Sequence, residues 1–567
     1  MGVRGLKTVL EKEKKMRYIN IANEVKKWKK SHPGKKPIIV IDFLCLANSY
    51  GDNIKDALCG GRHQIALSDW TKMLDALKAT ESTLVFFSDL NIQEGKVDEW
   101  LSRRDREFVE YTKFYNSIDS TAVSQMKKGR RAISSTFYQM AVIAQDYGQF
   151  NYSIRRECDL EIARFATNNN AMAIISNDND FLIFNGNWRL WSSEGMRNKS
   201  QRLKTIEFDR KSIPKLYSLA KHQLPLFATL LGNDFINFIQ LAKFHKRMGA
   251  MEHRVKNVAT YVRKVGRANL TNADIKQIAK HVFGENNEKL DHFERLIRES
   301  IDSYNTNVPR VHIDDPLELK LLNTRMYRPY MTIGYGIQGA TMCFYDMRGP
   351  GSTFPMLLID WIKRKKGILK RNTNDSFLLL AKKKINEKFR AHTETMICPD
   401  FALPSLDELY VGNGDDSKII DIKWKLLAWI MLLSDDEISL IKNLPKDFLM
   451  ISTTLFVLVK NKLIGTAEAD GILHTECMVL ANTTSNVQYP VALNPEYVRA
   501  AHIYNITFEH VRQNFSIAGL LPHIQELLKF DGKYFQKLME RITSLNTHER
   551  DNLFNPIKKY RIYDNII

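Results

Sequence analysis

Residues 172–184 read MAIISNDNDFLIF and decide the fold class of this 567-residue chain. The apolar run Met172–Ile175 has the length of a buried strand, and the polar segment SNDND follows it at once. Side chains at positions i and i+2 of an extended segment point the same way. Asp178 and Asp180 should therefore project together from the end of this strand. The next apolar run, Leu182–Phe184, is predicted to be a further short strand.

Similar apolar runs recur through the first 240 residues, and stretches with helical periodicity, such as Leu67–Ala79 and Ile133–Ala144, separate the earlier ones. The other predicted strands are Ile38–Ile41, Thr83–Phe87, Phe150–Ile154, Trp188–Trp191 and Lys204–Phe208. This alternation predicts an α/β fold with a mostly parallel central sheet covered by helices. In such sheets a functional site forms just beyond the carboxyl ends of the strands.

The chain is long enough for several domains. We predict an α/β domain over residues 1–240, a helical and basic extension of it over 241–310, and a mainly helical C-terminal domain over 311–567. Pro309 and Pro316 flank the polar break between the last two parts. The second half shows long helical patterns, for example Asp421–Leu433 and Ala501–Phe530, and few convincing strands.

Carboxylates follow the predicted strands at the edge where a site is expected. Seven acids are positioned to converge there: Asp42, Asp89, Glu157, Asp159, Asp178, Asp180 and Asp234. At a separation of about 4 Å and an effective dielectric near 20, each pair of charges would cost roughly 4 kcal/mol. A protein carries such repulsion when cations neutralise it, and carboxylate oxygens suit Mg²⁺ or Mn²⁺.

We therefore predict two divalent ions at this edge, which together can hold a phosphodiester and activate water. The alternative for any single acid is a local hydrogen bond at a strand end or helix cap. Glu161, one turn after Glu157, is expected to be a solvated helix residue.

The net charge favours an anionic partner. Lys plus Arg is 83 and Asp plus Glu is 64, which gives +19. Such an excess attracts polyanions, nucleic acid first, although a merely soluble basic protein is the alternative. The six cysteines form no CxxC pair, which fits a reducing, intracellular location. No membrane-spanning run or signal peptide is expected, because no apolar run is long enough and Lys and Glu crowd residues 7–15.

Short motifs in a fixed order resemble the flap-endonuclease superfamily. They are MGVRGL (1–6), IIVID (38–42), VFFSD (85–89), ECD (157–159), SNDNDF (176–181) and LLGNDF (230–235). The stretch HQLPLFATLLGNDF (222–235) resembles the Asteroid family within that superfamily. The resemblance covers residues 1–240 well and the rest weakly. It implies a PIN-like nuclease fold whose metal-binding acids correspond to the seven named above.

The same resemblance implies two catalytic cations, Lys96 and Arg103, that contact the scissile phosphate. Lys96 follows Asp89 by seven residues, and Arg103 follows Lys96 by seven more. Seven residues are about two helical turns, so both side chains project from one helix face. A solvated basic face, shared with Arg104 and Arg106, is the alternative. Arg104 is also predicted to contact nucleic acid.

Other predicted nucleic-acid contacts lie in the arch, about residues 106–136, and at the N-terminus. In the arch they are Lys127, Lys128, Arg130 and Arg131, beside aromatic residues that could stack on bases or pack onto the sheet. At the N-terminus, Gly2 is small enough for removal of the initiator methionine, and in the family this segment packs beside the active site. A departure from the family is the absence of glycine from residues 235–248, which puts the usual grip on duplex DNA in doubt.

Three functions remain open from the sequence. The first is a structure-specific endonuclease, for which the Asteroid resemblance implies DNA substrates with single-stranded or overhanging parts. The second is a nuclease-shaped scaffold without cleavage activity, which the resemblance to the constitutive-coactivator relatives of the superfamily implies. The third is an RNA-cutting relative, which would use the same metal site. Protein partners are expected to bind the C-terminal half. The run IKRKKGILKR (362–371) suggests a nuclear import signal, a phosphate-binding patch or a solvated loop.

Overall fold

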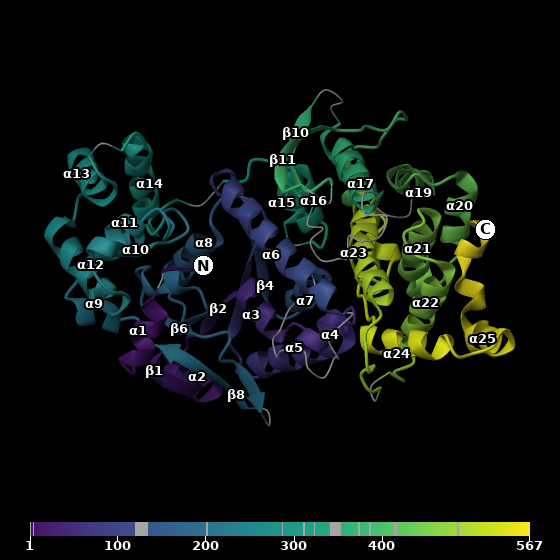
Figure 1. The fold of residues 1–567 in the computed structure, drawn as a ribbon, viewed down its shortest axis with the longest axis horizontal. Helices are drawn as coiled ribbons and strands as arrows, with labels where there is room; N and C mark the ends of the chain where they lie inside the picture. Colours follow the sequence, from purple (N-terminus) through teal and green to yellow (C-terminus); the bar gives the residue numbers. More distant parts are fainter. Residues whose placement is uncertain are drawn as a thin grey trace. The chain divides into compact units, whose positions relative to one another are not determined.

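The structure is a computed structural model that describes residues 2–3, 5–118, 134–199, 202–285, 287–309, 312–322, 324–340, 353–371, 375–384, 387–412, 417–484 and 487–566. The chain forms two compact units that interleave along the sequence. Unit 1 contains residues 1–49, 71–89 and 144–311, and unit 2 contains residues 50–70, 90–143 and 312–567. Figure 1 shows the elements of both units as ribbons.

Unit 1 is built on a mixed sheet, which among the described residues has eight strands. They are β1 (Met16–Asn20), β2 (Ile38–Asp42), β3 (Thr83–Asp89), β4 (Gln149–Ser153), β5 (Ala173–Ile175), β6 (Arg189–Trp191), β7 (Arg197–Lys199) and β8 (Arg202–Phe208). The order is β1-β8-β6-β5-β2-β3-β4, with β7 paired to β8. Strands β6, β5, β2, β3 and β4 run parallel, while β8 pairs antiparallel with both of its neighbours, β6 and β1. The predicted α/β class with a mostly parallel sheet is confirmed.

The central strands are apolar on both faces because both faces are covered. Val40, Val85 and Ile174 point into one core, and the alternate residues of β2 and β3, such as Ile39 and Phe86, are equally buried on the other side. This explains why the strands read as continuous apolar runs rather than alternating ones.

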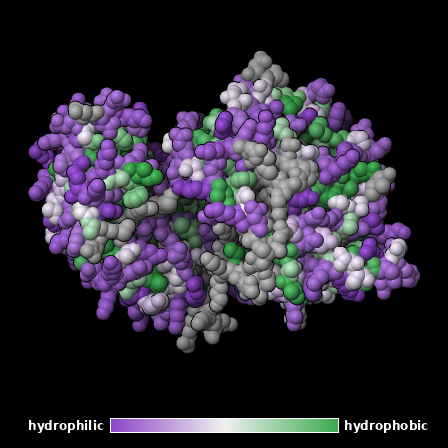
Figure 2. All heavy atoms as spheres, in the orientation of Figure 1, coloured by the Kyte–Doolittle hydropathy of each residue, from purple (hydrophilic) through white to green (hydrophobic). Residues whose placement is uncertain are grey.

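The helices of unit 1 divide into those beside the sheet and a helical cluster over residues 212–302. They are α1 (Leu6–Lys12), α2 (Ile21–Ser31), α3 (Phe43–Tyr50), α8 (Cys158–Asn168), α9 (Ser212–Tyr217), α10 (Leu224–Leu231), α11 (Ala242–Arg247), α12 (Met251–Val265), α13 (Asn272–Phe283) and α14 (Leu290–Asp302). One apolar core runs from Val40 of the sheet through Leu160 of α8 to Ile275 and Ile297 of the cluster. Figure 1 shows α11–α14 gathered together, and on the face in Figure 2 their surface is mainly hydrophilic.

Unit 2 is mainly helical. Its helices are α4 (Ile54–Leu58), α5 (His63–Lys78, which continues into unit 1), α6 (Val97–Ile118), α7 (Ser134–Gln145), α15 (Pro316–Leu321), α16 (Tyr327–Gly334), α17 (Thr353–Lys370), α18 (Leu406–Tyr410), α19 (Ser417–Met431), α20 (Asp435–Lys442), α21 (Lys446–Lys460), α22 (Thr466–Leu480), α23 (Pro495–Ile517), α24 (Gly532–Ile542) and α25 (Thr547–Phe554). A small sheet in its described part joins β9 (Gln338–Gly339), β10 (Ser376–Ala381) and β11 (Arg390–Thr395). No helix in the described ranges is long and apolar enough to cross a membrane.

Three local predictions were wrong. Residues Leu182–Phe184 are not a strand: the 3₁₀ helix η3 (Asn179–Leu182) begins right after Asp178 and includes Asp180, and the following residues fill the core. Strand β1 was missed because its sequence, MRYIN, is largely polar, as suits an edge strand. Glu161 is not a solvated residue, since its side chain is 16% exposed and its carboxylate pairs with Arg164 at 2.7 Å.

The basic run 362–371 is also not the exposed segment that the sequence suggested. It belongs to α17, where Lys365 and Lys366 are 0% and 4% exposed. Lys366 Nζ donates to the carbonyl of Ile333 at 2.8 Å, and Lys365 Nζ donates to Gln513 Oε1 at 3.0 Å. With its central lysines used inside the fold, the run is neither a solvated loop nor an accessible import signal or phosphate patch.

Candidate metal centre

The acids of the predicted site all belong to unit 1. Asp42 and Asp89 are the last residues of the parallel strands β2 and β3, and Asp178 follows β5 by three residues. Because these strands are parallel neighbours, their carboxyl ends meet at one edge of the sheet. Glu157 is the N-cap of α8, and Asp159 lies in the first turn of that helix.

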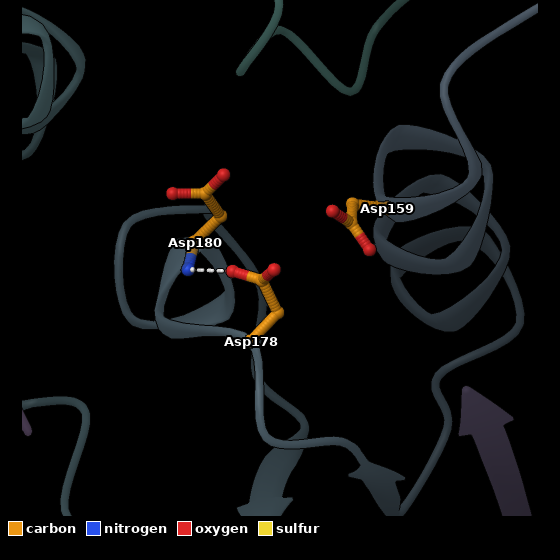
Figure 3. Close-up of side chains that lie close together, drawn as sticks. All are labelled: Asp159, Asp178 and Asp180. Carbon is orange, nitrogen blue, oxygen red and sulfur yellow. Dashed lines mark hydrogen bonds between the residues drawn. The ribbon is translucent and has the colours of Figure 1, made fainter. Parts of the chain in front are cut away.

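Three of the acids form a compact cluster. One carboxylate oxygen from each of Asp159, Asp178 and Asp180 lies within 4.8 Å of the others. Figure 3 shows Asp159 on its helix facing the two acids of the loop. The loop is held by Asp178, whose carboxylate accepts from the backbone N–H of Asp180 at 2.8 Å and caps η3. Asp178 and Asp180 therefore lie close together because Asp178 caps η3, whereas the sequence predicted an extended segment.

Asp42 lies next to this cluster and is tied to it by Ser176. The Ser176 hydroxyl donates to Asp42 Oδ2 at 2.6 Å and accepts from the backbone N–H of Asp178 at 3.0 Å. Burial raises the pKa of the Asp42 carboxyl, and the negative charge of Asp178 raises it further. The charge of Asp178 thus acts on Asp42, which is only 8% exposed.

Asp180 is affected both by burial and by the neighbouring acids. Burial, followed by the charges of Asp178 and Asp234, raises the pKa of Asp180 to about 7. Asp234 arrives at the site from the turn after α10, where Gly232 takes a φ of 100° that ends the helix. Its influence on Asp180 indicates that the last predicted acid also belongs to this neighbourhood.

The thiol of Cys158 is affected by three of the acids, among them Asp89. Burial raises the pKa of the Cys158 thiol, and the charges of Asp42, Asp159 and Asp89 raise it further. Six of the seven predicted acids therefore either have a pKa raised by a neighbouring acid or raise the pKa of a neighbouring group. The seventh, Glu157, caps the helix that carries Asp159. The donor set in the cluster consists of carboxylate oxygens, which suits a hard divalent cation such as Mg²⁺ or Mn²⁺. Such an ion would neutralise the repulsion among these carboxylates and offset the cost of burying them.

The N-terminal segment packs directly against the acids. The Val3 backbone N–H donates to Asp180 Oδ1 at 3.1 Å, and Asn179 Nδ2 donates to the Val3 carbonyl at 3.3 Å. A Cβ atom on Gly2 would lie 2.0 Å from Asp178 Oδ1. The glycine is therefore needed for close approach of the backbone to the cluster, whatever its part in binding nucleic acid.

Lys96, Arg103 and Arg104 belong to unit 2. Lys96 ends the 3₁₀ helix η1 (Glu94–Lys96), and Arg103 of α6 pairs with Glu99 at 2.9 Å. Arg104 pairs with Glu107 at 2.7 Å and lies over the Trp100 ring, with 20% of its side chain exposed. Lys127, Lys128, Arg130 and Arg131 fall outside the described residues. The roles of all these cations stay predictions.

Sequence reasoning missed the side chains that support the acids. Ser176 stands inside the SNDNDF motif, so its position next to Asp178 could have suggested a supporting role. Tyr304 donates to Asp180 Oδ1 at 3.0 Å from 124 positions further along the chain. A contact of that separation leaves no local signal in a single sequence.

Together, the strands and the acids define an α/β protein with a carboxylate cluster at the carboxyl edge of its sheet. Comparison with known proteins adds a partial match: the FAM120A-like domain family matches residues 217–308, which include Asp234 and the helices α10–α14.

Several curated proteins are similar over less than half of the chain. "Constitutive coactivator of peroxisome proliferator-activated receptor gamma" from Bos taurus is 28% identical over 243 residues, which cover 42% of this chain and 33% of that protein. The Homo sapiens protein of that name is 27% identical over 243 residues, 42% of this chain and 26% of that protein. "Constitutive coactivator of PPAR-gamma-like protein 1 homolog" from Xenopus tropicalis is 21% identical over 302 residues, 47% of this chain and 28% of that protein. The matched region thus spans a third or less of each relative, and none of these three is named as an Asteroid protein.

Among solved structures, the catalytic core of Rad2 in complex with DNA substrate is similar. One such complex has a TM-score of 0.29 and 14% identity, and the match covers 56% of this chain and 92% of that one. A second has a TM-score of 0.30 and 14% identity, covering 57% and 86%. A TM-score of this size does not assign an activity.

Proposed function

We propose that the protein is a metal-dependent phosphodiester hydrolase of the Asteroid type that acts on DNA with single-stranded or overhanging parts. The observation that carries this function is the grouping of Asp159, Asp178 and Asp180 within 4.8 Å. The placement of Asp42 and Asp89 at the ends of adjacent parallel strands supports it further. A net charge of +19 favours a polyanionic substrate.

The acids would hold two Mg²⁺ or Mn²⁺ ions. When bound, such ions supply a water activated for attack and stabilise charge on a phosphate. The protein's own contribution is to keep the carboxylates in fixed directions, as Ser176 does for Asp42 and the Val3 N–H does for Asp180. No side-chain nucleophile is required.

The cations of unit 2 are proposed to act on the phosphate. Lys96 and Arg103 would stabilise the charge that develops during cleavage, which is the main catalytic effect available to this chemistry. Arg104 and the arch residues Lys127, Lys128, Arg130 and Arg131 would hold the substrate backbone. Gly2 would allow the N-terminal segment to lie beside the substrate as well as beside the acids.

The test is cleavage by the purified full chain of labelled single-stranded, 3′-overhang, 5′-flap and duplex DNA, with matching RNA. Reactions run with Mg²⁺, with Mn²⁺ and with EDTA, beside the double variant Asp178→Asn/Asp180→Asn. Metal-dependent cutting that the double variant lacks is the expected result. Cutting that persists in the variant would refute the metal assignment. Preferential cutting of RNA would show that RNA, and not DNA, is the substrate.

A second candidate function is a nuclease-shaped scaffold that binds nucleic acid or proteins without cutting. The observation that favours it is the similarity to proteins named constitutive coactivators. Binding without cleavage under every metal tested would select this function. In either case we propose that the protein works inside the cell, in the nucleus, and that protein partners bind its C-terminal half.

A further inference from the structure

A tyrosine from the helical cluster reaches the back of the carboxylate cluster. Tyr304 lies two residues after α14 (Leu290–Asp302), and its hydroxyl donates to Asp180 Oδ1 at 3.0 Å. The side chain is 7% exposed, and its ring lies 5.1 Å from that of Phe184.

The same helix also holds the turn that delivers Asp234. Asn233 Nδ2 donates to Ser300 Oγ at 2.7 Å and to Tyr304 Oη at 3.4 Å. On its other side, Asn233 Oδ1 accepts from the backbone N–H groups of Phe235 and Ile236 at 3.1 and 3.2 Å. The turn after α10 is therefore fixed to α14 by a buried set of hydrogen bonds.

We propose that Tyr304 is a positioning residue of the metal centre, and that α14 sets the affinity of the acids for a divalent cation. This inference rests on the proposed function, because it assumes that Asp180 binds a metal ion. Tyr304 acts through Asp180 and touches neither metal nor substrate in this account.

The hydrogen bonds to Asp180 explain how the positioning works. Its Oδ1 atom accepts from both Tyr304 Oη and the Val3 N–H, at 3.0 and 3.1 Å. Two donors on one oxygen fix the rotation of the carboxylate. Loss of such an outer partner of a metal ligand typically weakens metal binding by roughly 10–100-fold.

Packing alone does not require the hydroxyl. The contact of the Tyr304 ring with Phe184 is apolar, and it survives in Tyr304→Phe. The variant therefore removes the hydrogen bond that the hydroxyl donates to Asp180 and the longer one that it accepts from Asn233, while keeping the shape of the ring. A purely structural role for Tyr304 would leave metal affinity unchanged. A matched control exists in the same unit: Tyr147 Oη donates to Asp75 Oδ1 at 2.6 Å, just before the amino end of β4 and opposite the acid edge.

The experiment is a titration of the full chain with Mn²⁺ alone, followed by electron paramagnetic resonance of the free ion, together with thermal melting of the metal-free protein. We expect Tyr304→Phe to weaken Mn²⁺ binding by about 10–100-fold, with little change in the metal-free melting temperature. Tyr147→Phe should bind Mn²⁺ like the wild type. Ser300→Ala removes the hydroxyl that accepts from Asn233 at 2.7 Å and also bonds to Thr229 Oγ1 at 2.7 Å, but it leaves both hydrogen bonds to Asp180 in place. It should cause a smaller loss and serves if Tyr304→Phe does not fold.

Wild-type affinity in both Tyr304→Phe and Ser300→Ala would overturn the inference. So would equal losses in Tyr304→Phe and Tyr147→Phe, since that would indicate general loosening of unit 1. A wild-type protein that binds no Mn²⁺ would remove the metal centre and the inference with it. Binding of Mn²⁺ without any cleavage would refute the proposed function, yet the comparison of the variants would still decide the role of Tyr304.

Discussion

Substitution of Gly2 by alanine should damage the metal centre although Gly2 is not an acid. A Cβ atom at this position would lie 2.0 Å from Asp178 Oδ1, 2.7 Å from the Asn179 nitrogen and 2.8 Å from the Asp180 nitrogen. Real Cβ atoms do not approach neighbours closer than 3.0 Å, so the Asp178 carboxylate or the whole segment must move by about 1 Å.

The segment cannot easily retreat, because the next residue is anchored. Val3 is fully buried, its N–H donates to Asp180 and its carbonyl accepts from Asn179. The displacement therefore falls on the loop that carries Asp178 and Asp180. A shift of about 1 Å in a reacting group can cost roughly 100-fold in rate. We expect a similar loss of cleavage, a loss of about 10-fold or more in Mn²⁺ affinity, and destabilisation by about 1–3 kcal/mol.

The assay compares Gly2→Ala with Gly5→Ala from the same segment. Gly5 has a φ of 80°, so alanine is strained there, but its Cβ would meet only Val255 Cγ2 at an ordinary 3.6 Å. Gly5→Ala should lose about 1–2 kcal/mol of stability and keep the Mn²⁺ affinity of the wild type. If Gly2→Ala also kept that affinity, the close approach of the N-terminal segment to the acids would be refuted.

Three further outcomes test the two units separately. At a Mn²⁺ concentration about 100 times the Kd, the wild type should gain about 2.7 kcal/mol of stability in a thermal melt, and Asp178→Asn/Asp180→Asn should gain none. Burial lowers the pKa of Lys365 to about 7 from 10.5. Between these values the unfolded chain holds the proton more tightly, so wild-type stability rises with pH there. Lys365→Met should have a higher melting temperature than the wild type at pH 7, and this difference should shrink as the pH rises toward 10.5. Arg512→Ala removes the buried guanidinium that contacts the Glu509 carboxylate at 2.8 Å, where the Glu509 side chain is 15% exposed, and should cost about 3 kcal/mol by urea denaturation.

The sheet and the positions of its acids could be predicted because both follow from local patterns. A strand buried on both faces must be apolar, and an acid immediately after it must lie at the sheet edge. Ile38–Ile41 and Thr83–Phe87 became β2 and β3 with their acids at the ends. The edge strand β1 escaped notice because an edge strand needs no apolar run, as the 84% exposure of Tyr18 illustrates.

What failed was decided by tertiary contacts. The lysines of 362–371 look like a solvated basic run until α17 buries two of them against carbonyl and amide oxygens. The run Leu182–Phe184 is apolar enough for a strand, but the cap formed by Asp178 starts a 3₁₀ helix in its place. Tyr304 could not be found at all, since its partner Asp180 is distant in the sequence.

Holding a metal ion and cutting a phosphodiester require different parts of this chain, and Arg103→Ala can separate them. The acids belong to unit 1, whereas Arg103 belongs to α6 of unit 2 and pairs there with Glu99 at 2.9 Å. That ion pair is 36% and 30% exposed and would cost only about 0–1 kcal/mol to exchange for a phosphate. If the protein is a nuclease, Arg103→Ala should lower kcat by about 100-fold or more while Mn²⁺ affinity stays unchanged. Loss of both together would mean that Arg103 supports the fold, and loss of neither would remove it from the catalytic machinery. A metal centre that survives in a wild-type protein without cleavage would instead fit the scaffold, in which the acids hold an ion for stability alone.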